Sequence, residues 1–70
     1  MWIEMKSFTE QHTAQLLLVD DEPNIRQPLA RALSLKGYDV QEAGAGYEAL
    51  TLLQHTPFDL MVLDMHMPDL

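Results

Sequence analysis

Three aspartates that follow short apolar runs are the residues of this sequence best suited to chemistry. The runs are Leu16 to Val19, followed by Asp20 and Asp21, and Leu60 to Leu63, followed by Asp64. A continuous apolar run of this length is typical of a strand buried on both faces, and open α/β sheets keep their chemistry at the carboxyl ends of such strands. We therefore expect the three carboxylates to converge in one crevice.

Such a cluster predicts a cation. Carboxylates that share a crevice repel one another unless a positive ion lies among them. The sequence has no cysteine, and its three histidines show no metal-ligand spacing, so the available ligands are oxygens. Oxygen ligands favour a hard ion, Mg²⁺ or Mn²⁺, held by one or two carboxylates and a phosphate oxygen. A carboxylate beside that ion can attack a phosphoryl group in an in-line transfer.

A helix is expected between the two apolar runs. Pro23 and Asn24 open it, with Asn24 as the N-cap, and Lys36 with Gly37 ends it. Pro28 removes one backbone hydrogen bond, so we expect a slightly distorted first turn. The expected apolar face comprises Ile25, Leu29, Ala32, Leu33 and Leu35.

A second strand and a second helix follow. Tyr38 to Ala43 alternates between apolar and polar residues, which predicts a half-solvated edge strand. Tyr47 to Gln54 is typical of a helix that Pro57 prevents from continuing. Its expected inward residues are Ala49, Leu50 and Leu53.

The resulting order is βαβαβ, which predicts an α/β fold with a parallel sheet and right-handed crossovers. The strands that end in acid are the most apolar, so we expect the strand order 2-1-3. The crossovers then run in opposite directions, which places the helices on opposite faces and the aspartates at the switch point between the first and third strands.

Composition limits the possible partners. The chain has 70 residues and a net charge of −7, which argues against a nucleic-acid or anionic-membrane surface. Its 47% hydrophobic content is enough for a collapsed domain, although the core of so short a chain is marginal. The apolar runs are too short to span a bilayer, and the absence of cysteine suits a reducing cytoplasm. We expect a cytoplasmic chain that does not enter a membrane.

Residues 1–15 differ from the rest and are interpreted as an N-terminal extension. Met1, Met5, Phe8 and His12 fall at helical spacing, without a convincing apolar run. The segment is either a leader or a tail with a few apolar residues, or a cover for core that would otherwise be exposed.

Four stretches together resemble the receiver domain of bacterial two-component response regulators, the CheY-like family with a flavodoxin-like fold. They are residues 16–26, 37–40, 47–50 and 57–69. The resemblance covers residues 16–70 in consistent order and spacing. It implies phosphorelay signalling, in which a sensor histidine kinase donates a phosphoryl group from a phosphohistidine.

The resemblance also implies a role for each site residue. Asp64 would accept the phosphoryl group, Asp21 would bind Mg²⁺ directly, and Asp20 would bind it largely through water. The backbone carbonyl of His66 would be the remaining protein ligand. Glu22 would at most assist. The protein would be a self-modified regulatory domain rather than an enzyme.

The sequence departs from the family pattern in its extent. A receiver has five strand-helix units in the order 2-1-3-4-5, with a switch Ser/Thr after the fourth strand and a Lys after the fifth, and these 70 residues stop before both. We therefore expect a truncated receiver with weak or absent phosphorylation. Its third strand would be an open edge, which predicts a homodimer or higher homo-oligomer joined through third strands.

Other interpretations remain open at this stage. The acidic residues at 20–22 and 64 could be solvated strand ends, and His12, His55 and His66 ordinary surface histidines. Trp2 and the five methionines are more typical of core or tail than of a binding site. The alternative function is a half-receiver interaction module that pairs with itself or with intact receivers, without phosphotransfer.

Overall fold

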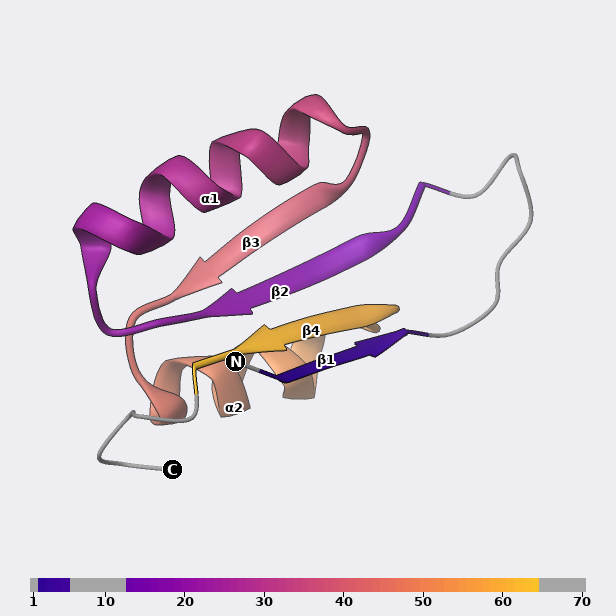
Figure 1. Cartoon of the computed structure of the whole chain (residues 1–70). Helices are drawn as coiled ribbons and strands as arrows, with labels where there is room; N and C mark the ends of the chain where they lie inside the picture. Colours follow the sequence, from indigo (N-terminus) through magenta and orange to yellow (C-terminus); the bar gives the residue numbers. More distant parts are fainter. Residues whose placement is uncertain (1, 6–12, 65–70) are drawn as a thin grey trace.

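The computed structural model describes residues 2–5 and 13–64, which form one four-stranded sheet with a helix on each side (Figure 1). The elements, in chain order, are β1 (Trp2–Met5), β2 (Gln15–Val19), α1 (Pro23–Leu35), β3 (Asp39–Ala43), α2 (Gly46–His55) and β4 (Leu60–Leu63). Among the described residues, neither helix is long and apolar enough to cross a bilayer.

The parallel part of the sheet confirms the expected topology. The sheet order is β1-β4-β2-β3, in which β2 pairs in parallel with both β3 and β4. The three strands that the sequence predicts are therefore ordered second, first, third. Residues 16–19 of the central strand are buried, whereas β3 lies at an edge and is only partly covered. Burial of each large side chain in the centre contributes about 1.5–3 kcal/mol.

The strand β1 overturns the expectation of an open edge. Trp2–Met5 pairs with β4 in antiparallel register, from Trp2 opposite Leu63 to Met5 opposite Leu60. These four residues are therefore a strand, which the helical spacing within residues 1–15 did not indicate, and they cover the edge of β4 that was expected to be open. Because β2 and β1 occupy the two edges of β4, the third strands of two copies cannot pair in this arrangement.

The two helices cover opposite faces of the sheet, as expected (Figure 1). Ala30, Leu29 and Leu33 of α1 pack on the face that carries Leu16 and Leu18 of the central strand. On the other face, Ala49 and Leu52 of α2 pack against Leu17, Val19, Ala43, Met61 and Leu63. Alternation along β2 therefore supplies both halves of the core.

The ends of α1 are set by the residues around it. Glu22 is the N-cap, and Pro23 occupies the first turn, so the expectation of Asn24 as N-cap is wrong. Proline suits this position because the N–H that it lacks would have no partner inside the helix. The helix runs through Pro28 to Leu35, with Lys36 as its C-cap, and Gly37 follows with φ of 102°, a left-handed conformation that favours glycine.

Several apolar residues expected to face inward are exposed instead. In α1, Ile25 and Leu35 are 56% and 81% exposed; in α2, Leu50 and Leu53 are 60% and 43% exposed. Ala32 is also exposed. Each helix rests on the sheet along a narrow strip, so a wide apolar stripe extends beyond the surface that the sheet covers.

Candidate metal and phosphoryl-acceptor site

The register of the parallel strands brings Asp20 and Asp64 to the same edge of the sheet. Val19 lies opposite Leu63, so the next residue of each strand leaves the sheet at the same level. The backbone N–H of Asp64 donates to the carbonyl of Val19 at 3.0 Å, and that of Asp20 donates to the carbonyl of Ala43 at 3.1 Å. Backbone bonds thus position both aspartates.

The three predicted aspartates converge. One carboxylate oxygen from each of Asp20, Asp21 and Asp64 lies within 4.8 Å of the others. Asp20 is only 3% exposed, Asp64 is half-buried and Asp21 is exposed, so the cluster runs from the interior to solvent. The sequence-based expectation that these three aspartates converge is confirmed.

The carboxylate of Asp20 is held by its own turn. Its Oδ1 accepts the backbone N–H of Glu22 at 2.9 Å, across the connection between β2 and α1. This bond fixes the side chain at a position where its neighbours are two further carboxylates. Glu22 contributes that N–H and caps α1, and its own side chain is exposed and makes no cap hydrogen bond.

The donor set fits a hard divalent cation. Three carboxylate oxygens within 4.8 Å repel one another, and a divalent ion among them removes that repulsion. Mg²⁺ and Mn²⁺ prefer such oxygen ligands, and the exposed side of the cluster leaves room for water or a phosphate oxygen. The fourth expected ligand, the carbonyl of His66, lies outside the described residues.

The histidine that the structure describes is engaged elsewhere. A ring nitrogen of His55, Nδ1, lies 2.8 Å from the carbonyl oxygen of Thr51, one turn earlier in α2. His12 and His66 lie outside the described residues. His55 is therefore an exposed residue of α2 and is not among the residues of the aspartate cluster.

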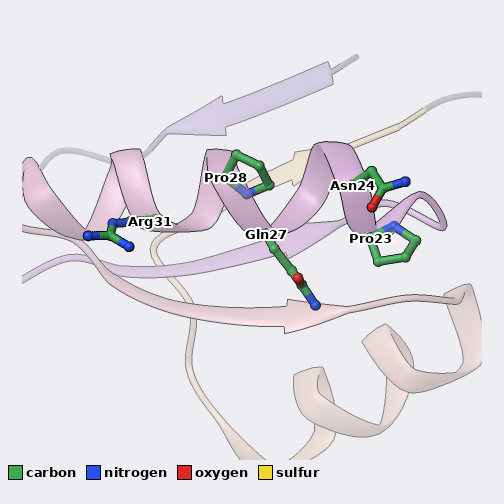
Figure 2. Close-up of a pocket in the computed structure, with 5 residues that line it drawn as sticks. All are labelled: Pro23, Asn24, Gln27, Pro28 and Arg31. Carbon is green, nitrogen blue, oxygen red and sulfur yellow. The ribbon is translucent and has the colours of Figure 1, made fainter.

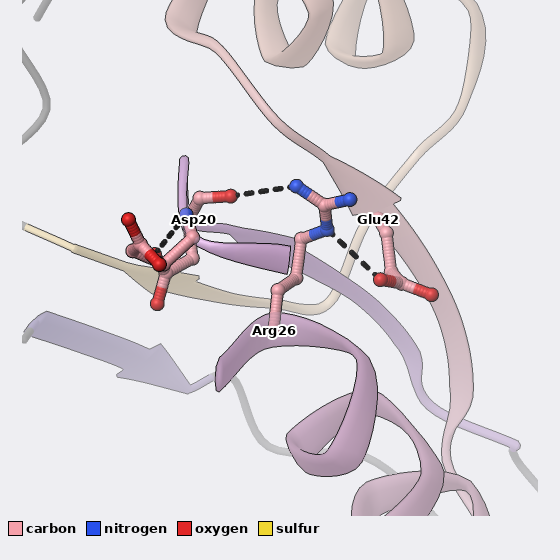
Figure 3. A network of polar contacts seen from close by, with 4 residues as sticks. Asp20, Arg26 and Glu42 are labelled. Atoms are coloured by element: carbon pink, nitrogen blue, oxygen red, sulfur yellow. Dashed lines mark hydrogen bonds and ion pairs between the residues drawn. The ribbon is translucent and has the colours of Figure 1, made fainter. Parts of the chain in front are cut away.

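The sequence analysis missed one polar contact beside the cluster. Arg26 reaches from α1 to the end of β2, where its Nη1 donates to the backbone carbonyl of Asp20 at 2.9 Å (Figure 3). Its Nε also donates to Oε1 of Glu42 in β3 at 2.9 Å, which forms an ion pair. An arginine in a first helical turn is too common to have predicted this contact without the fold.

A shallow hollow of about 440 Å³ lies along α1 (Figure 2). Its lining residues are Pro23, Asn24, Gln27, Pro28 and Arg31. All five are exposed and none is acidic, so this hollow offers no carboxylate to a cation. The aspartate cluster remains the candidate site.

Comparisons with known proteins agree with this fold. Residues 16–70 match the family model described as the response regulator receiver domain. The chain is 47% identical over 70 residues to the probable transcriptional regulator ycf27 of Cyanidium caldarium, a match that covers 100% of this chain and 27% of that protein. It is 42% identical over 55 residues to the sensor protein EvgS of Escherichia coli, covering 79% of this chain and 5% of that protein.

A solved structure shows the same architecture. The chemotaxis response regulator CheY4 of Vibrio cholerae matches with a TM-score of 0.79 and 39% identity, over 84% of this chain and 49% of that one. The fold and the acidic crevice define a parallel α/β module with the switch point of the flavodoxin-like class. The chain belongs to the response regulator receiver domain family of two-component systems. It spans about a quarter of the ycf27 relative.

Proposed function

We propose that the chain accepts a phosphoryl group on Asp64 from a sensor histidine kinase, in a reaction that depends on Mg²⁺ or Mn²⁺. The observation that carries this proposal is the convergence of Asp20, Asp21 and Asp64 within 4.8 Å at the carboxyl edge of the sheet. Family membership supports it because receiver domains interact with sensor kinases.

In this proposal Asp64 is the phosphoryl acceptor, and the other two aspartates are ligands of the cation. A carboxylate oxygen of Asp64 forms the new bond to phosphorus as the bond between phosphorus and the donor's histidine nitrogen breaks, so the product is an acyl phosphate and a free imidazole. Asp20 and Asp21, with the backbone carbonyl of His66, would hold the cation, which would supply positive charge beside the transferring oxygens. The chain is then an acceptor that is itself modified, and not an enzyme that turns over.

This proposal also implies a class of phosphoryl donor and a cell compartment. The donor is a phosphohistidine on a sensor kinase, which places the chain in the cytoplasm with the kinase's catalytic part. The net charge of −7 favours neither nucleic acid nor an anionic membrane as a direct partner of this segment.

A second candidate is an interaction module that pairs with itself or with intact receivers, without phosphotransfer. The observation that favours it is the exposure of large apolar side chains on both helices, at Ile25, Leu35, Leu50 and Leu53. Apolar surface of this kind on a small domain is typical of a protein-protein contact.

Incubation with Mg²⁺ and acetyl phosphate, followed by intact mass measurement, separates the two candidates. The phosphoacceptor proposal predicts a phosphorylated species in low yield, in line with the weak phosphorylation expected from the sequence, and Asp64→Asn should abolish it. The matched control is Asp59→Asn, which makes the same change just before β4 and should leave the product in place. No product in the folded wild-type chain, or a product that persists in Asp64→Asn, contradicts the proposal.

A further inference from the structure

Arg26 links three elements that meet at the aspartate cluster. Its guanidinium extends from α1 and bonds to the backbone carbonyl of Asp20 at the end of β2 and to the carboxylate of Glu42 on β3, each at 2.9 Å (Figure 3). The side chain of Arg26 is 16% exposed and that of Glu42 is 37% exposed. A largely buried arginine with two directed hydrogen bonds loses little further conformational entropy when it stays ordered.

The bond to Asp20 goes to the main chain and leaves the carboxylate to the cluster. The Asp20 carboxylate accepts the N–H of Glu22, and its carbonyl accepts Nη1 of Arg26. The backbone of Asp20 is also bonded through its N–H to Ala43 of β3. Three directed bonds therefore fix the residue from which the buried ligand projects.

A glycine leaves the space in which the guanidinium lies. A Cβ built on Gly44 would come within 2.8 Å of Nη1 of Arg26 and within 3.4 Å of Oε1 of Glu48. The only positive φ angle among the described residues is that of Gly37, so the backbone at Gly44 accepts alanine. An alanine there would displace the arginine head and leave every charge unchanged.

We propose that Arg26 is a positioning residue that holds Asp20 in place for the divalent cation. This inference rests on the proposed function, since the cation is the one that phosphoryl acceptance requires. Arg26 acts as an outer-shell support through the backbone of Asp20, with Glu42 fixing the far side of the guanidinium. Supports of this kind affect metal affinity because they orient the ligands.

The sign of the effect distinguishes positioning from charge. A guanidinium beside the cluster repels a divalent cation, so an effect of charge alone predicts tighter binding when Arg26 is neutralised. Positioning predicts weaker binding, because the turn that carries Asp20 and Asp21 loses one of its fixed points. A role in stability alone predicts a lower melting temperature with unchanged affinity.

Calorimetric titration with Mg²⁺, below the melting temperature of every variant, provides the test. We expect Arg26→Met to weaken Mg²⁺ binding about tenfold, as outer-shell changes do, and Gly44→Ala to weaken it by a smaller factor. The matched control is Arg31→Met, which removes the same charge from an exposed position of the same helix and should leave the affinity unchanged. If Arg26→Met does not fold, the Mg²⁺ affinity of Gly44→Ala alone tests the positioning role.

The outcomes separate this inference from the proposed function. A folded wild-type chain that binds no Mg²⁺ overturns the proposed function, and the inference with it. Wild-type binding that is equally tight or tighter in Arg26→Met, or unchanged in Gly44→Ala, overturns the positioning role and leaves the proposed function standing.

Discussion

Carboxylates lie at both ends of the parallel sheet, yet they are arranged differently. At the amino end, Asp59 and Asp39 accept hydrogen bonds from Gln15, through its backbone N–H and its side-chain amide respectively, each at 2.9 Å. At the carboxyl end, Asp20, Asp21 and Asp64 lie within 4.8 Å of one another. At the amino end a single residue, Gln15, donates to both carboxylates, whereas at the carboxyl end three carboxylates lie close to one another.

This difference shows that an acidic residue at a strand end is not by itself a site. Gln15 lies opposite Asp39 in the register of β2 and β3, so its amide reaches a neighbouring carboxylate. Such a bond satisfies a carboxylate oxygen with a neutral donor and stabilises the fold. At the carboxyl end three like charges lie close together, and a positive ion would relieve their repulsion.

The largest effect that the comparison predicts is on Mg²⁺ affinity. Asp64→Asn removes a ligand charge, so we expect at least a hundredfold loss of affinity, more than outer-shell changes cost. Calorimetric titration measures this loss directly. Asp59→Asn is the control at the other end, and a comparable loss there would remove the distinction between the two ends.

The next effect is stabilisation by the cation. At a concentration 100 times its dissociation constant, Mg²⁺ should raise the free energy of unfolding by about 2.7 kcal/mol, because it binds the folded state. Urea unfolding with and without Mg²⁺ measures this difference. Asp64→Asn should show almost none of it, whereas Asp39→Asn should retain it.

At the amino end, a smaller effect on stability is expected. Asp59→Ala removes the acceptor of the Gln15 N–H, and the free energy of unfolding should fall by about 1 kcal/mol. The measurement is urea unfolding in EDTA, paired with an Mg²⁺ titration of the same variant. A fall in Mg²⁺ affinity as large as that in Asp64→Asn would show that the two ends are not independent.

The smallest predicted effect is a rise, and not a fall, in the free energy of unfolding. Without metal, Asp21→Asn relieves repulsion within the cluster, so the free energy of unfolding should rise by about 0.5 kcal/mol. At saturating Mg²⁺, Asp21→Asn should be less stable than wild type, because it has lost a ligand of the cation. Metal-free unfolding that is easier in Asp21→Asn than in wild type would mean that the cluster is not repulsive.

The sequence was sufficient to predict the cluster because local patterns determine it. Two apolar runs specify buried strands, and acidic residues directly after them lie at the carboxyl edge in any parallel arrangement. The expected strand order then brings Asp64 beside Asp20. The contact of Arg26 with Glu42 was missed because it depends on how α1 crosses β3, which no spacing in the sequence encodes.

The sequence was insufficient where pairing is long-range or coverage is partial. Trp2–Met5 is a strand of four residues whose partner β4 lies near the other end of the chain, and its spacing also suits a helix. An antiparallel strand at the edge of a parallel sheet is common in mixed sheets. Periodicity likewise marks Ile25 and Leu50 as apolar, but cannot say how much of each helix the sheet covers.

Paramagnetic broadening by Mn²⁺ in amide NMR spectra compares the two ends of the sheet in one experiment. The account predicts that substoichiometric Mn²⁺ broadens the amide signals of Asp20, Asp21 and Asp64 first, while those of Asp39 and Asp59 persist. Equal broadening at both ends, or none at the three aspartates, would contradict a cation site at the carboxyl edge.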